Sequence, residues 1–198
     1  MQPALALIEF DSIAAGIEAG DTMAKKAPVA RIIAGTVQRG KYLVLVAGAV
    51  ADVEEALAAG LAVGASAELD HVYLPGVHPH VVDAIAMQRR LRAIAALGVV
   101  ETRTVAAAIA AADAGIKGAE VNLLEVRLAD GLGGRGLVLF DGLVADVEAA
   151  VRIGTDIIAG TKALIHAVVI PQFHPEMAEN LLADTRWRPR AQDLTPQA

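Results

Sequence analysis

The feature that most constrains this chain is an internal repeat. Three blocks recur in the same order, at 5–29 and 97–121, at 40–54 and 134–148, and at 74–79 and 170–175. The first pair shares 10 of 25 residues and the second shares 10 of 15. The spacing grows from 92 to 94 to 96 residues, which places one short insertion before Gly134 and another between the second helix and the last strand of copy two. An internal repeat of this length predicts that the same supersecondary unit occurs twice in the chain.

Hydrophobic periodicity and turn residues predict the same element order in both copies. Copy one is expected to contain a strand, a helix, two strands, a second helix, a strand and a short final helix, over residues 4–10, 12–26, 29–37, 42–47, 51–64, 68–74 and beyond 79. This β-α-β-β-α-β order is that of the ferredoxin-like split unit. We therefore expect an α+β fold of two tandem ferredoxin-like domains over 4–88 and 96–184, with a connector over 89–95 and a mobile tail over 185–198.

The first helix of each copy carries two finer predictions. In copy one Ser12 or Asp11 can cap the helix. Apolar and small residues recur at helical spacing and predict its buried face: Ile13, Ile17, Gly20 and Ala24. Near the helix ends, Lys25 and Lys117 each follow an aspartate by four residues, a spacing that favours an ion pair on one face of the helix.

Composition narrows the class of protein. The chain is 55% hydrophobic and 20% charged, but its longest stretch without a charged residue is 13 residues, 163–175, too short to cross a bilayer. No signal-peptide pattern opens it, so a soluble cytoplasmic protein is expected. The net charge of -6 argues against nucleic-acid binding. So many apolar residues in so small a chain predict that part of its surface is an interface.

No catalytic arrangement is recognisable, and we expect no enzyme and no cofactor. A glycine-rich stretch over 131–136 leads into a strand rather than a helix, which favours a hairpin turn over a phosphate loop. His78 and His80 with a carboxylate could hold a metal. However, His78 and His174 occupy the same repeat position before a proline, which favours a turn or an interface. With no cysteine, thiolate chemistry is excluded.

The matched blocks together resemble the bacterial microcompartment shell-protein domain. They read GxVETxxVAAAIxAADAxxKxAxV over 98–121, GxxLVLxxGxVADVExA from Gly134 onward, and a closing VIPxxHP. Two copies resemble the tandem-domain, trimeric class of that family. Both copies keep the ordinary element order, as in the single-layer trimer of propanediol-utilisation shells and unlike the circularly permuted kind.

The resemblance implies a structural tile. Three chains would form a pseudohexameric homotrimer around a central pore for small polar metabolites, and tiles would join other shell proteins edge to edge. The turn after the second strand of each copy would line the pore, which assigns to it Val37, Gln38, Arg39 and Gly40, and Gly131, Leu132, Gly133 and Gly134. The tile edge would carry Lys25, Lys117, His78 and His174.

One departure from the family pattern concerns the pore turn. The propanediol-type trimer holds an iron–sulfur cluster through a cysteine there, whereas this chain has Gln38 at the matching position. A thiolate-ligated cluster is therefore excluded. An alternative function on the same fold is a trimeric small-molecule sensor, which would hold a ligand between subunits and would not form sheets.

Overall fold

The computed structural model describes residues 3–86 and 95–183. Copy one consists of β1 (Ala4–Phe10), α1 (Ile13–Lys26), β2 (Arg31–Val37), β3 (Lys41–Gly48), α2 (Val50–Gly64), β4 (Glu68–Leu74) and α3 (Pro79–Ile85). Copy two consists of β5 (Ala96–Thr102), α4 (Val105–Gly118), β6 (Asn122–Ala129), β7 (Arg135–Gly142), α5 (Val144–Ile158), a short 3-10 turn (Ala159–Thr161), β8 (Leu164–Ile170) and α6 (Pro175–Ala183). The predicted element order is confirmed in both copies.

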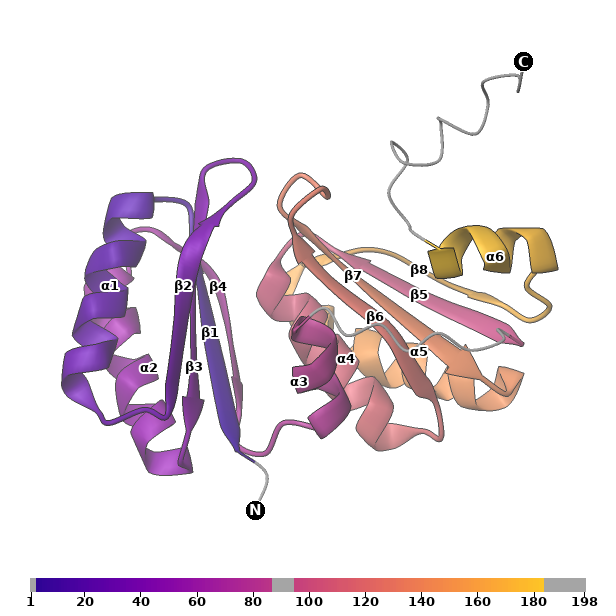
Figure 1. Ribbon diagram of the computed structural model, residues 1–198, viewed down its shortest axis with the longest axis horizontal. Helices are drawn as coiled ribbons and strands as arrows, with labels where there is room; N and C mark the ends of the chain where they lie inside the picture. Colours follow the sequence, from indigo (N-terminus) through magenta and orange to yellow (C-terminus); the bar gives the residue numbers. More distant parts are fainter. Residues whose placement is uncertain (1–2, 87–94, 184–198) are drawn as a thin grey trace.

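Each copy forms one four-stranded antiparallel sheet. The strand orders are β2-β3-β1-β4 and β6-β7-β5-β8, so the two copies have the same central and edge strands in the same order. The registers correspond too: Glu9 lies opposite Asp70, and Glu101 lies opposite His166, each just before a register shift. Figure 1 shows the two sheets side by side, with α3 and α4 between them. The predicted pair of ferredoxin-like domains is therefore present.

Both predicted insertions lie where the repeat spacing indicates. The turn between β2 and β3 spans residues 38–40, whereas the turn between β6 and β7 spans residues 130–134. The second insertion lies in the 3-10 turn that separates α5 from β8. Both occur outside the helices, where added residues disturb the packing least.

The predicted buried face of α1 is wrong in part. Its buried residues are Gly16, Ala19, Gly20 and Met23. Ile13 and Ile17 are 39% and 53% exposed. The helix lies so close to its sheet that a Cβ on Gly16 would come within 2.5 Å of the Tyr42 ring. Small residues therefore face the sheet, and the isoleucines lie on a face that this chain alone does not cover.

The two sheets differ in what covers the face away from the long helices. In copy two, Ala178 of α6 packs with Leu97, Leu124 and Leu139. In copy one, the corresponding face borders an open apolar cavity of about 620 Å³ between the sheet and α3. The predicted tail, and the predicted connector except Ala95, lie outside the described residues. Among residues 3–86 and 95–183 no helix combines the length and apolar character that a membrane crossing requires.

Candidate functional site

The junction between the two copies has two parts: α4 of copy two lies along the edge strand β4 and its neighbour β1 of copy one, and α3 of copy one lies against the edge strand β6 of copy two. Val105 and Ile109 of α4 are fully buried there, in a cluster that also contains Leu7 and Val72 of copy one. The interface joins two different surfaces, a helix on one copy and a sheet edge on the other. It is therefore a head-to-tail junction.

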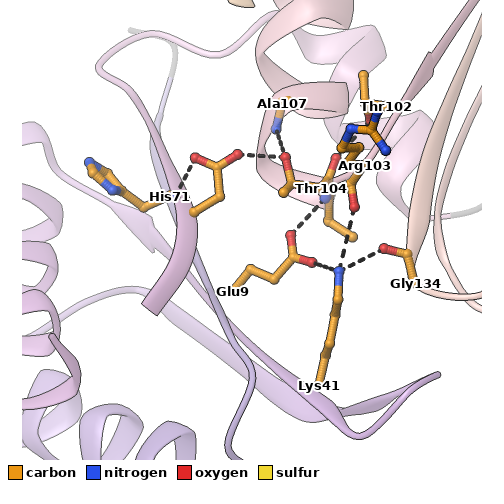
Figure 2. A network of polar contacts seen from close by, with 10 residues as sticks. Glu9, Lys41, His71, Thr102, Arg103, Thr104, Ala107 and Gly134 are labelled. Carbon is orange, nitrogen blue, oxygen red and sulfur yellow. Dashed lines mark hydrogen bonds and ion pairs between the residues drawn. The ribbon is translucent and has the colours of Figure 1, made fainter. Parts of the chain in front are cut away.

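A buried carboxylate ties the N-terminus of α4 to copy one (Figure 2). Glu9 has no exposed side-chain surface, and its Oε1 accepts a hydrogen bond from Lys41 Nζ at 2.5 Å. Its Oε2 accepts from the backbone N–H of Val105 at 2.7 Å. Lys41 Nζ also donates to the carbonyl oxygen of Gly134 at 2.9 Å. Glu9 thus satisfies one of the free N–H groups at the start of the helix and neutralises a lysine.

Burial and pairing shift the pKa of the Glu9 carboxyl group in opposite directions. Removal from water raises the pKa of Glu9 above its usual value of 4.5, and this effect outweighs the lysine and the N–H donor, which lower it. Asp70, opposite Glu9 on β4, contributes further in the raising direction. The carboxylate is therefore held at the junction at an electrostatic cost.

A second polar contact caps the same helix. Thr104 is the N-cap of α4: its Oγ1 accepts from the N–H of Ala107 at 3.4 Å and donates to Asp70 Oδ2 at 2.5 Å. The threonine hydroxyl therefore caps its own helix and binds the neighbouring copy at the same time. Figure 2 shows this contact beside the Glu9 pair.

The far end of α4 contacts the closing turn of copy one. Lys117 Nζ donates to the carbonyl oxygen of Gly76 at 2.5 Å and pairs with Asp113 at 2.5 Å. Asp113 in turn accepts from the backbone N–H of His78 at 2.8 Å. The structure thus brings Lys117 and His78 together at the outer end of the junction. The predicted i, i+4 pairs of both helices are present, since Lys25 pairs with Asp21 at 2.5 Å.

His78 and His80 have a local structural relation. His78 is the N-cap of α3, and its Nδ1 accepts from the N–H of His80 at 3.2 Å. The two rings pack edge to face, with centroids 4.9 Å apart. Within 3–86 and 95–183, His, Asp and Glu side chains nowhere gather in a group of three or more that could hold a metal ion. His174, the matching residue of copy two, directly precedes α6.

The two turns assigned to a pore lie side by side at one end of the molecule (Figure 1). Gln38 Oε1 accepts from the backbone N–H of Gly133 at 3.0 Å, which joins the two turns directly. Positive φ angles occur at Arg39 and Gly40, and at Gly131, Gly133 and Gly134. Glycine adopts this backbone region freely, so the glycine-rich composition is what lets the longer turn fold back. Arg39 is exposed between them.

These turns do not fit a cysteine-ligated iron–sulfur cluster. The matching side chain, Gln38, is an amide whose oxygen already accepts a backbone hydrogen bond, and the chain contains no cysteine. Such clusters are held by thiolates. The described residues of the turns instead offer backbone N–H groups, an amide and a guanidinium.

Sequence reasoning missed the buried network of Glu9, Lys41, Asp70 and Thr104. Its partners are separated by 32 to 96 residues, and no local pattern reports such distances. One signal was available: a single acid recurs inside an otherwise apolar strand of both copies, as Glu9 and Glu101. A charge kept at the same place in two apolar strands indicates a required partner.

The surfaces that form this junction occur again, uncovered, on the other copy. Val105 and Ile109 are fully buried, whereas their matches on α1 are the exposed Ile13 and Ile17. The Glu101–Arg135 pair matches Glu9–Lys41, at 2.7 Å, but its carboxylate side chain is 34% exposed. Two further matches differ in the same way: Val72 and Val81 are buried, while Val168 and Met177 are exposed. The chain therefore presents an unused helix face at one end and an unused sheet edge at the other.

Comparison with known proteins identifies the two copies. Residues 4–77 and 96–173 each match the BMC domain. The chain is 36% identical over 177 residues to the bacterial microcompartment shell protein PduT of Citrobacter freundii, which covers 89% of this chain and 96% of that protein. It is 42% identical over 88 residues to the major carboxysome shell protein CsoS1A of Halothiobacillus neapolitanus, covering 44% of this chain and 87% of that one.

Solved structures agree with this comparison. A microcompartment protein from Desulfitobacterium hafniense superposes with a TM-score of 0.78 at 40% identity, covering 90% of this chain and 99% of that chain. A fused permuted hexameric shell protein, MSM0275, gives a TM-score of 0.60 at 20% identity, with 81% and 86% covered, and shares the fold. The chain belongs to the BMC-domain family, as a shell protein of a bacterial microcompartment with two tandem domains in ordinary order.

Proposed function

We propose that this shell protein is a structural tile that assembles as a pseudohexameric homotrimer. The observation that carries the proposal is the head-to-tail junction together with its unused halves, the face of α1 and the edge strand β8. A repeated head-to-tail interface closes into a ring when the rotation from one unit to the next divides a full turn. Three chains would supply six domains in alternation, with α1 of each chain on β8 of the next, as α4 lies on β4 within the chain.

The apolar face of α1 gives the direct test. Analytical ultracentrifugation of the unchanged chain is expected to give three times its 20.4 kDa mass. Ile17→Glu should leave the chain folded but reduce the trimer, because a carboxylate would be placed where Ile109 is buried in the matching junction. The matched control is Val63→Glu, since Val63 and its repeat match Ile157 are both exposed. Trimers that survive Ile17→Glu, or a mass other than three chains, would refute the ring.

The paired turns support a central pore in this tile. Both turns lie at the same end of the molecule and are joined by Gln38 and Gly133, so a ring of three chains would bring six turns together around one axis. Three copies of Arg39 would add positive potential there and favour small polar or anionic metabolites. The proposal predicts altered metabolite flux in shells that carry Gln38→Trp or Arg39→Glu. Unchanged flux in both would contradict a selective pore at these turns.

Tile edges are the remaining part of the proposal. Lys25 and Lys117 lie at the ends of α1 and α4, away from the turns, with His78 beside Lys117 and His174 at the matching place in copy two. These residues would contact other shell proteins edge to edge. Nothing in the proposed function requires catalysis, and the tile needs no cofactor of its own.

A further inference from the structure

The outer end of the junction within the chain is held by hydrogen bonds to backbone groups. Asp113 of α4 accepts from the backbone N–H of His78 at 2.8 Å, and Lys117 donates to the carbonyl oxygen of Gly76. Both backbone groups belong to the closing turn of copy one. The contact is covered, since Val77 in the turn is 1% exposed and the Asp113 side chain is 5% exposed. The aspartate and lysine of α4 therefore act as a turn-binding pair for the other copy.

The same turn-binding pair occurs again, uncovered, on α1. Asp21 lies 92 residues before Asp113, at the matching position of the repeat. Its Oδ2 pairs with Lys25 Nζ at 2.5 Å, and the pair on α4 has the same distance. The Asp21 side chain is 58% exposed, in contrast to the covered Asp113. A preformed acceptor for a turn thus lies at the surface of copy one.

The matching turn occurs on copy two, between β8 and α6. Residues 172–174 match residues 76–78 in the last block of the repeat. In each copy the middle residue of the three donates its backbone N–H to the carbonyl oxygen of the residue just before the first strand of that copy, at 3.2 Å in copy one and 3.4 Å in copy two. The two turns are therefore held in the same place on their own domains. His78 is half-buried there, whereas His174 is exposed.

We propose that Asp21 of each chain accepts a hydrogen bond from the backbone N–H of His174 of the next chain. The inference rests on the proposed trimer. Figure 1 shows α1 and α6 at opposite ends of the molecule, so the acceptor and the turn before α6 cannot meet within one chain. In the ring, α1 would lie on β8 of the next chain as α4 lies on β4, which brings Asp21 to the turn that follows β8.

The proposed contact recognises backbone groups rather than side chains. The two turns differ at two of the three matched residues, with Gly76 and Val77 in copy one and Gln172 and Phe173 in copy two. An N–H and a carbonyl oxygen are present whichever side chains the turn carries, so these differences leave both hydrogen bonds available. A carboxylate that binds a backbone N–H is directional. It would fix the angle between chains that the apolar contact of α1 with β8 leaves free.

The lysine of the pair contributes less than the aspartate. Lys117 is 40% exposed while it binds Gly76, so a lysine at this position keeps surface for contacts between tiles. Ion pairs and hydrogen bonds of exposed lysines contribute little to stability. A hydrogen bond to a covered carboxylate contributes more, because water does not compete for it. The decisive test of the inference is therefore substitution of Asp21.

Asp21→Ala is tested by sedimentation of the full chain at neutral pH. It should raise the concentration at which the trimer half-dissociates at least about tenfold, because two junctions break when one chain leaves and each has lost a hydrogen bond to a charged acceptor. Asp21→Asn keeps one acceptor oxygen for the N–H of His174, and it should weaken the trimer less than Asp21→Ala does. Circular dichroism should show both variants folded, since the Asp21 side chain is exposed.

The matched control is Glu55→Ala. It removes the same charge from another exposed pair, Glu55 with Lys26, at a position where copy two already has Ala149, and it should leave association unchanged. The inference is overturned by a trimer that Asp21→Ala does not weaken, by an equal effect of Glu55→Ala, or by an asparagine variant as weak as the alanine variant. An unchanged chain that is not a trimer would instead refute the proposed function.

Discussion

At the scale of residues, the junction depends on Glu9. Its two oxygens bind groups from β3 and from the start of α4, and the side chain has no exposed surface. A buried carboxylate is tolerated in a protein interior when its charge is paired and its oxygens are hydrogen-bonded. One side chain therefore joins three elements of two domains.

Replacing Glu9 by glutamine should lower the free energy of unfolding by about 1–3 kcal/mol. Glutamine has one acceptor oxygen, so either Lys41 Nζ or the N–H of Val105 would lose its partner and face an NH2 group. Urea unfolding at fixed chain concentration measures the change. The control is Glu55→Gln, whose pair with Lys26 spans 3.9 Å between exposed side chains and should change stability by less than about 0.5 kcal/mol. Equal effects of the two substitutions would contradict the role given to Glu9.

The raised pKa of Glu9 predicts a pH dependence. Because the folded chain holds this proton more tightly than the unfolded chain, its contribution to stability is full below pH 4.5 and is lost as pH rises through the folded pKa. The free energy of unfolding, followed at about pH 5, 6 and 7, should therefore decline more with pH in the unchanged chain than in Glu9→Gln. Parallel curves, or a steeper decline in the variant, would count against burial as the dominant cause.

Residue patterns in the sequence predict local contacts but not this network. The Lys25–Asp21 and Lys117–Asp113 pairs follow from helical spacing alone. The contact between Glu9 and Val105 spans 96 residues and depends on how two domains dock. Helical geometry is a short-range rule, whereas docking is set by the shapes of whole surfaces, so the network could not be predicted from sequence.

At the scale of elements, close packing of helices on sheets depends on small residues. In copy one the glycine is on the helix, and in copy two it is on the strand. In copy one, Gly16 of α1 faces Tyr42 of β3; in copy two, Ala108 of α4 faces Gly136 of β7, where a Cβ would come within 2.4 Å of the Ala108 Cβ. The larger side chain has changed sides while the spacing has been kept. Complementary volume, rather than residue identity, is what the two copies share here.

Two glycines on α1 give a matched pair of substitutions. Gly16→Ala should destabilise the chain by about 1–3 kcal/mol, because the added Cβ would lie 2.5–2.9 Å from atoms of Tyr42. Gly20→Ala should stabilise it by about 0.5–1 kcal/mol, because its Cβ would meet Val44 at an ordinary 3.5 Å and alanine favours the helix. Urea midpoints with unchanged slopes would show both effects. The same sign for both substitutions would disprove this account of the packing.

The elements were the most predictable part of the fold. In copy one, β1 and β4 have the predicted bounds, and the ends of β2, β3, α1 and α2 lie within about two residues of the prediction. The face of α1 was not predictable, because apolar periodicity marks a surface that is to be covered without saying by what. Ile13 and Ile17 are exposed in the chain, and only in the proposed ring would another domain cover them.

At the scale of the whole molecule, exposure distinguishes two kinds of surface. Residues buried in one copy and exposed in its match, such as Val72 and Val168, are those that the proposed ring would cover. Residues exposed in both copies, such as Val63 and Ile157, lie outside the junction. Comparing exposure at matched positions of the two copies therefore separates the surface that belongs to the junction from the surface that does not.

Removing the edge lysines separates contacts within a ring from contacts between rings. Lys25→Ala with Lys117→Ala should abolish sheets in concentrated samples under negative-stain microscopy, while sedimentation still shows trimers. Lys117 also binds Gly76 within the chain, so the two single variants serve as controls for that contact. Intact sheets in the double variant would refute the edge assignment. Loss of trimers would show that these lysines contribute to contacts between the chains of one ring instead. A protein that never forms sheets, alone or with partner tiles, would favour the sensor alternative.

The buried contact of Glu9 also has a consequence for biosynthesis. Copy one leaves the ribosome with its carboxylate and the edge of β4 uncovered, and the N–H that completes the site belongs to a residue 96 positions later. Counted from the end of β4 at Leu74 to Val105 at the start of α4, the wait is roughly 2–6 s at about 5–20 residues per second. During that time the edge of β4 in the first domain is unpaired and uncovered, so the nascent first half is the stage of synthesis at which this shell protein is most open to aggregation.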